Sequence, residues 1–151
     1  MKIVLGSDEF GHRLKEVLKK HLEKIKVDYQ DIGCRPGESV SYPDIAERVA
    51  LAVAQGDCER GILICGTGIG MAIAANKVPG VRAACCHDVY SAERARKSNN
   101  AQIITMGGLV IGEELAKKLL DIWLQSEFGG GRSKPKVSKL DEIDEKYRKR
   151  V

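Results

Sequence analysis

Apolar residues follow two alternating patterns along the chain. Five short runs are mostly apolar, as strands of a covered sheet are; they occupy 2–6, 27–32, 61–65, 81–86 and 102–106. Between these runs, apolar residues recur every three or four positions, which is the spacing of amphipathic helices; these segments are 12–25, 43–55, 70–77, 89–97 and 113–124. Five strand–helix units predict a three-layer α/β/α, Rossmann-like fold with a five-stranded parallel sheet and right-handed crossovers.

The segment 129–151 is set apart by its Gly-Gly-Gly start, which indicates a hinge after the α/β domain at 1–128. Ser138 is expected to begin a last helix, with Asp141 three residues on as a capping-box-like partner. Its apolar stripe is thin and consists of Leu140, Ile143 and Tyr147. We expect this helix to belong to the same domain and to extend to a partner subunit as a dimer arm, with docking on its own domain as the alternative.

Charge is spread unevenly over the chain. The net charge is 25 − 21 = +4, and the excess lies after residue 131. A solvated basic helix explains that excess, and so does a site for an anionic substrate. Nucleic-acid binding is disfavoured, because Tyr147 is the one aromatic residue in that segment and no nucleic-acid motif accompanies it. No apolar run approaches the ~20 residues of a membrane span, and no signal peptide is evident, so we expect a cytoplasmic protein without a membrane partner.

The five cysteines contain no C-x-x-C pair and no histidine spacing of a zinc site. We therefore expect no metal, and reduced thiols in a reducing compartment. Cys85 and Cys86 lie in an apolar stretch and are expected to be buried.

Candidate chemistry lies in the loops next to the strands. Ligands of open parallel sheets bind at the carboxyl ends of strands, where this chain has 7–11, 65–70 and 87–88, with Ser98-Asn99-Asn100 preceding the fifth strand. Gly66, Gly68 and Gly70 open a helix and leave backbone N–H groups free to face an anion. Met71 breaks the dinucleotide fingerprint, and no Gly-Lys-Ser/Thr of a P-loop occurs, so no nucleotide cofactor is expected.

Two groups at these loops have competing interpretations. Cys65 is either a buried structural thiol or a base or nucleophile whose thiolate is favoured by the helix start, and its position alone leaves both open. Asp8 and Glu9 suggest the magnesium acids of a phospho-receiver domain, but Cys65 and Met106 occupy the places of that domain's aspartate and lysine. A solvated acidic turn is the remaining alternative.

Together these residues resemble the type B ribose-5-phosphate isomerase and galactose-6-phosphate isomerase family, from Gly6 to about Tyr147. The most specific blocks are Ile-Cys-Gly-Thr-Gly-Ile-Gly at 64–70 and Ala-Ala-Asn-Lys-Val-Pro-Gly-Val-Arg-Ala at 74–83. Tyr42-Pro43-Asp44, Asn99, Gly107, Gly112 and Gly130-Gly131-Arg132 also match. The resemblance implies an aldose–ketose isomerase of phosphorylated sugars that uses a cis-enediolate and neither metal nor cofactor.

The resemblance also implies roles for single residues. Cys65 would move the proton with Thr67 beside it, and the loop of Gly66, Gly68 and Gly70 would donate N–H bonds to the enediolate. Asp8 would bind substrate hydroxyls and Asn99 would support the intermediate. Arg132 and Lys136 would hold the phosphate across a subunit interface, in a homodimer or tetramer.

The departures from the family pattern bear on the substrate. Glu9 and Ser98 stand where the family usually has histidines, Leu109 and Lys136 stand where it has arginines, and Ser133 replaces another histidine. His87 could compensate and open the ring of a pentose phosphate. A tetrose 4-phosphate closes no such ring, because its O4 carries the phosphate. Residues 91–94 and 98–107 are also similar to family members that act on erythrulose 4-phosphate, so both ribose 5-phosphate and a tetrose 4-phosphate are expected candidates.

A non-catalytic or hetero-oligomeric sugar-phosphate-binding subunit is the alternative function. Galactose-6-phosphate isomerase is similar in having two unlike subunits, one of which also carries Asp-Glu in its first loop. The Cys-Gly-Thr-Gly loop at 65–68 is intact here, which favours catalysis.

Overall fold

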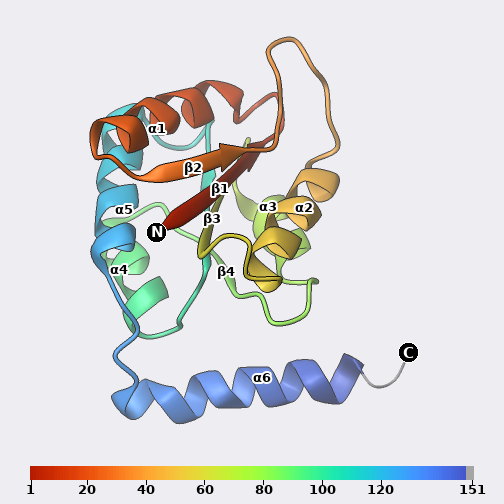
Figure 1. Ribbon diagram of the computed structural model, residues 1–151, viewed down its shortest axis with the longest axis vertical. Coiled ribbons are helices and arrows are strands. Elements are labelled where there is room, and N and C mark those ends of the chain that lie inside the picture. Colours follow the sequence, from red (N-terminus) through yellow and green to blue (C-terminus); the bar gives the residue numbers. More distant parts are fainter. Residues whose placement is uncertain (149–151) are drawn as a thin grey trace.

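Five short strands form a parallel sheet in the computed structural model, which describes residues 1–148 (Figure 1). The strands are β1 (Lys2–Ser7), β2 (Asp28–Asp31), β3 (Arg60–Cys65), β4 (Ala83–Cys85) and β5 (Ile103–Gly107). Their order is β2-β1-β3-β5-β4, so β2 and β4 are the edge strands. At the carboxyl edge, Ser7 pairs with Ile64 and Cys65 pairs with Gly107. This register sets the ends of β1, β3 and β5 side by side.

Helices cover both faces of the sheet, which confirms the predicted three-layer α/β/α fold (Figure 1). One face packs against α1 (His12–Lys24), α4 (Val89–Lys97) and α5 (Glu113–Gln125), and the other against α2 (Tyr42–Ala54) and α3 (Ile69–Ala75). All six residues of β3 are buried, as expected of its continuous apolar run. The central strand that ends at Cys65 is therefore held rigidly from both sides.

The fourth strand is shorter than the predicted 81–86. Val81 N–H closes a turn on Val78 O and Arg82 N–H donates to the Gln102 side chain, so the ladder to β5 begins at Ala83. The prediction that Cys85 is buried is wrong, because it ends an edge strand and its side chain is exposed. Cys86 is buried as predicted, and burial raises the pKa of its thiol to about 12.

The C-terminal helix begins earlier than predicted. A short 3-10 turn, η1 (Gly131–Ser133), leads directly into α6 (Lys134–Arg148). Pro135 fits the first turn of this helix, where a missing N–H costs nothing. Ser138 therefore lies inside the helix and does not cap it.

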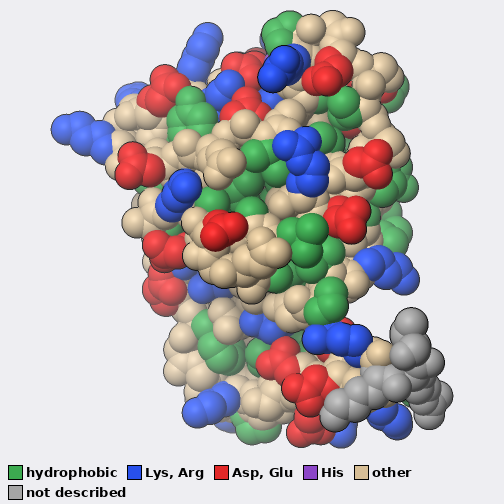
Figure 2. Space-filling view, turned by 45° about the vertical axis from the view of Figure 1, so that its right-hand side comes forward, with side chains coloured by type: hydrophobic (Ala, Val, Ile, Leu, Met, Phe, Trp, Pro, Cys, Tyr) green, Lys and Arg blue, Asp and Glu red, His purple; other side chains and the backbone are tan. Residues whose placement is uncertain are grey.

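Helix α6 lies along the amino edge of the sheet, at the bottom of Figure 1. It contacts its own domain through the buried Val137, an Arg82–Asp141 ion pair of 2.8 Å and a 2.9 Å bond from Gly80 N to Asp144. Leu140 and Ile143 stay 46% exposed. Basic and acidic side chains are interspersed over the face drawn in Figure 2, α6 included. Within residues 1–148, no helix has the length and apolar character of a bilayer span.

Candidate active site

The Cys65 thiol lies at the end of β3, next to the glycine loop formed by residues 66–70. Its sulfur accepts a hydrogen bond from Gly68 N–H at 3.1 Å, and its side chain is 5% exposed. Gly68 adopts φ +78°, and a Cβ there would lie 2.8 Å from the Met106 carbonyl carbon. Glycine at 68 is thus required for the close approach that brings its N–H to the sulfur. An N–H donor on sulfur stabilises a thiolate.

The carbonyl groups of residues 65–68 are all held from the β4–β5 side. Gly108 N donates to Cys65 O at 2.8 Å, and Leu109 N donates to Gly66 O at 3.1 Å. Cys85 Sγ donates to Thr67 O at 3.7 Å, and Thr105 Oγ1 donates to Gly68 O at 2.7 Å. We find no acceptor for the Gly66 or Thr67 N–H group within residues 1–148. These two donors are available to an oxyanion bound beside Cys65.

Asp8 joins the same edge from β1. Its N–H donates to Ile64 O at 3.3 Å, which places it one residue from Cys65 on the neighbouring strand. Oδ1 accepts the N–H groups of Phe10 and Gly11, both at 3.0 Å, whereas Oδ2 accepts no bond from residues 1–148. Burial raises the pKa of Asp8, although the bonds from Gly11 and Phe10 oppose the rise. One oxygen thus fixes the loop and the other is free for a substrate hydroxyl.

The Glu9 carboxylate is turned toward the loop 33–41. It accepts hydrogen bonds from Ser39 Oγ and Val40 N, both at 3.2 Å. Hydrogen bonds from its own backbone N–H and from Val40 lower the pKa of Glu9, so the group is ionised. Both oxygens are engaged, and Glu9 is therefore an anchor for this loop in the single chain.

His87 lies beside the loop, at the end of β4. Its Nε2 accepts the Gly107 N–H at 2.9 Å, and Gly107 is the partner of Cys65 in the sheet. Because a backbone N–H can only donate, Nε2 carries a lone pair and the ring proton is on Nδ1. His87 can therefore offer one N–H donor in this geometry.

The structure does not bring the remaining predicted residues to this edge. Ser98 and Asn99 follow the C-terminus of α4, which runs back from the carboxyl edge to the amino edge. Arg96, on the last turn of α4, shares Glu127 with Arg60, the first residue of β3. Arg132 and Lys136 belong to η1 and α6, at the same amino edge (Figure 1). A five-residue strand spans about 17 Å, so one chain separates the predicted site into two halves.

Two residues that sequence reasoning gave no role lie at the glycine loop. A Cβ at Gly70 would lie 2.5 Å from the Tyr42 ring, so that ring covers the first turn of α3. Cys85 donates to the Thr67 carbonyl. Tyr42-Pro43-Asp44 belongs to the family pattern, but no sequence signal ties the tyrosine to Gly70. Within residues 1–148, no three His, Cys, Asp or Glu side chains lie together as a metal site.

Comparisons with known proteins identify the family and the fold of the chain. The sequence model of the Ribose/Galactose Isomerase family matches residues 3–140. A ribose-5-P isomerase B of Listeria innocua is 59% identical over 98% of this chain and 100% of its own length. A D-erythrulose-4-phosphate isomerase of Pectobacterium atrosepticum is 51% identical over 93% of each chain. The solved Clostridium thermocellum ribose-5-phosphate isomerase B superposes with a TM-score of 0.95 at 48% identity, over 97% of this chain and 99% of the other.

Proposed function

The chain belongs to the ribose/galactose isomerase family and is a sugar-phosphate isomerase, and we propose that it interconverts aldose and ketose through a cis-enediolate. The observation that carries the proposal is the buried Cys65 thiol, held by Gly68 N–H beside the free N–H groups of the loop. Enediolate chemistry needs a base to move the proton and hydrogen-bond donors next to it that stabilise the oxyanion.

Cys65 is the proposed proton carrier. As a thiolate it takes the proton from C2 of the open-chain aldose, and the C–H electron pair forms the C1–C2 double bond. The carbonyl π electrons move to O1, which gives the enediolate. The thiol, whose proton exchanges with solvent, then gives a proton to C1. O1 takes up the proton that O2 loses, and O2 becomes the ketone oxygen, so no metal or redox cofactor enters the balance.

The loop and Asp8 hold the reacting carbons. Gly66 and Thr67 N–H groups are the proposed donors to the oxygen that gains charge. Asp8 Oδ2 is the proposed acceptor for a substrate hydroxyl, since Oδ1 is already used by Phe10 and Gly11. Thr67 Oγ1 accepts from Ile69 N at 3.2 Å and keeps its own proton to donate.

A second copy of the chain is the proposed source of the phosphate-binding half. Arg132 and Lys136 form no ion pair or hydrogen bond with other side chains of residues 1–148. They share the amino edge with Asn99 and Ser98, far from Cys65 of the same chain. The half-exposed Leu140 and Ile143 on α6 offer apolar surface for the contact. Two copies, each placing its amino edge at the other's Cys65, complete two sites, in a dimer or in a tetramer made of such pairs.

A four-carbon sugar phosphate is the proposed substrate. Opening a furanose ring needs a group that gives up a proton to the ring oxygen. His87 cannot do this in the observed geometry, because Nε2 is held by Gly107 N–H and loss of the Nδ1 proton would leave an imidazolate. Ser98, which replaces the usual histidine, has no acidic group that could donate this proton. A tetrose 4-phosphate needs no ring opening, and a relative of 51% identity is named for erythrulose 4-phosphate.

The experiment compares kcat/KM of the purified chain on erythrose 4-phosphate and ribose 5-phosphate, with Ser98→His beside the wild type. We expect the wild type to prefer the tetrose, and Ser98→His to gain on ribose 5-phosphate. A wild type that prefers ribose 5-phosphate, with no gain by Ser98→His, would refute the substrate proposal. A chain that binds the sugars without turnover would instead support a hetero-oligomeric binding subunit.

A further inference from the structure

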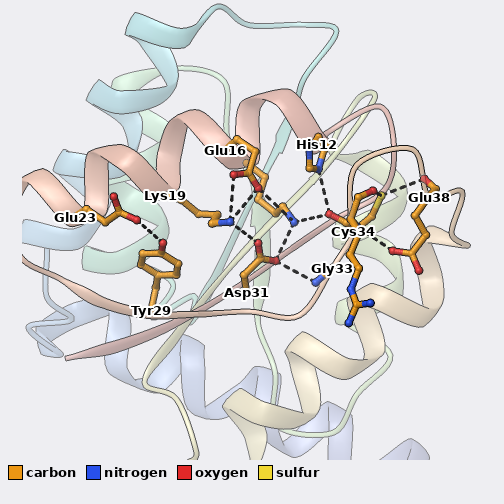
Figure 3. Close-up of polar contacts among 11 residues, drawn as sticks. His12, Glu16, Lys19, Glu23, Tyr29, Asp31, Gly33, Cys34 and Glu38 are labelled. Carbon is orange, nitrogen blue, oxygen red and sulfur yellow. Dashed lines mark hydrogen bonds and ion pairs between the residues drawn. The ribbon is translucent and has the colours of Figure 1, made fainter.

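Lys15 is a buried cation outside the catalytic residues. It belongs to α1 and its side chain is 1% exposed. Nζ donates to Asp31 Oδ1 and to the Cys34 carbonyl, both at 2.8 Å, and lies 4.0 Å from Glu16. Figure 3 labels these three partners. A buried ammonium is costly unless it is paired and hydrogen-bonded. The contacts of Lys15 therefore constrain the backbone they touch.

That backbone adjoins the loop 7–11, which follows β1 and contains Asp8. Gly33 N donates to Asp31 Oδ1 at 3.1 Å, and Gly33 O accepts the N–H of Ser7 at 2.7 Å. Ser7 immediately precedes Asp8. Lys15 thus holds the Cys34 carbonyl and Asp31 holds the Gly33 N–H group, while the Gly33 carbonyl between them supports the end of β1.

The same loop reaches the second acid of the pair. His12 Nδ1 is a second donor to the Cys34 carbonyl, at 3.0 Å, and the Cys34 thiol donates to Glu38 O at 3.2 Å (Figure 3). A few residues later, Ser39 and Val40 bind the Glu9 carboxylate. The loop 33–41 is therefore fixed at its root by Lys15 and joined near its end to Glu9.

We propose that Lys15 is a positioning residue that sets Asp8 for substrate binding through the loop 33–41, which Glu9 anchors. The inference rests on the proposed function, in which Asp8 Oδ2 binds a substrate hydroxyl. Lys15 touches no group that would contact substrate; it acts through the Cys34 carbonyl and through Asp31, which holds Gly33.

Lys19 provides a matched control on the same helix. Its Nζ pairs with the other oxygen of Asp31, at 2.8 Å, and with Glu16 at 3.0 Å (Figure 3). Although burial opposes it, the hydrogen bonds that Lys19 donates to Asp31 and Glu16 raise the pKa of Lys19, so it stays charged beside Asp31. Lys19 makes no hydrogen bond to the loop 33–41 within the described chain. Lys15→Met and Lys19→Met thus each remove one positive charge from beside the Asp31 carboxylate. Lys15→Met also removes a hydrogen bond to the loop 33–41.

The test measures kcat and KM for erythrose 4-phosphate and ribose 5-phosphate, and hydrogen–deuterium exchange of segments 7–11 and 33–41. For Lys15→Met we expect KM to rise about tenfold with kcat changed less than about threefold, because hydroxyl binding is lost while Cys65 is untouched. Exchange should quicken in both segments. Lys19→Met should leave KM and exchange as in the wild type. Equal KM values and equal exchange in the two variants would overturn the proposal.

A milder variant covers the case in which Lys15→Met does not fold. His12 is partly exposed and supplies the second bond to the Cys34 carbonyl, so His12→Ala should raise KM about threefold and quicken exchange in 33–41. Wild-type KM and exchange in His12→Ala would overturn the proposal in that case. A wild type inactive on every sugar phosphate would refute the proposed function instead, and the exchange results would still decide whether Lys15 holds the loop.

Discussion

Cys65 is the last residue of β3, and Cys58 lies just before the start of that strand. Both side chains are buried in the core between the sheet and α2. Of the two, Cys65 faces the glycine loop. We expect Cys65→Ala to fold normally and to lose at least ~10²-fold in kcat, the usual contribution of a general base. Cys58→Ala, the same deletion in the same core, should keep kcat. Near-normal turnover by Cys65→Ala would assign the base to another residue, with Glu9 examined first.

The Asp8 carboxyl should contribute its own step to the acid limb of the pH profile, beside the protonation of the Cys65 thiolate. Burial raises its pKa, so it takes up a proton at a higher pH than a free aspartate, whose value is near 3.9. The protonated form no longer accepts a substrate hydroxyl through an anionic oxygen. We expect the fall of kcat/KM with decreasing pH to steepen where Asp8 takes up its proton, above the ordinary aspartate range, and Asp8→Asn to have low kcat/KM without that second step. An unchanged acid limb in Asp8→Asn would assign it elsewhere.

Sequence reasoning locates the chemistry of single residues unevenly. Cys65 and its loop can be predicted because a strand end, alternating glycines and a helix start are all local signals. The contacts of Glu9 cannot, because its partners Ser39 and Val40 are about thirty positions away in the chain and carry no motif. The burial of Lys15 cannot be predicted from the sequence either, because a lysine in an amphipathic helix normally indicates a solvated face.

At the level of elements, the glycine loop depends on one left-handed residue. Gly68 and Gly56 have nearly the same φ, +78° and +82°, but a Cβ would come within 4 Å of other backbone atoms at Gly68 and would meet open space at Gly56. Gly56→Ala should therefore cost about 1 kcal/mol of unfolding free energy and leave kcat unchanged. Gly68→Ala carries the same strain and also collides with Met106, so the loop must move away from Cys65. We expect kcat to fall at least tenfold, measured beside the denaturant midpoint; equal kcat in both variants would contradict this.

The order of strands and helices can be read from the sequence, whereas several boundaries cannot. Periodicity identifies α1 to α5 because each buries one apolar face. The start of α6 is not evident, since Pro135 and the lysines around it carry no apolar periodicity and Ser138 resembles a cap. The predicted strand β4 is too long because Val81 is apolar, although a turn to Val78 and not the sheet uses its N–H.

At the level of the whole molecule, the two halves of the proposed site lie at opposite edges of one chain. If two copies complete each other, inactive variants of different halves should complement. Cys65→Ala lacks the base, and an Arg132→Ala, Lys136→Ala double variant lacks the phosphate cations. After subunit exchange, half of the dimers are mixed and each holds one intact site. The mixture should recover about a quarter of wild-type activity at substrate levels below KM. No recovery, with exchange confirmed by mass, would place both halves in one chain.

Proton transfer by Cys65 is the central step of the proposed reaction, and isomerisation in D₂O tests it most directly. Erythrose 4-phosphate and ribose 5-phosphate are incubated with wild type and Cys65→Ala, and the carbons next to the carbonyl are followed by NMR. We expect the wild type to form ketose that carries solvent deuterium on C1, and Cys65→Ala to form neither ketose nor deuterated aldose over the same time. Ketose free of deuterium after many turnovers, or exchange by Cys65→Ala at the wild-type rate, would contradict the account.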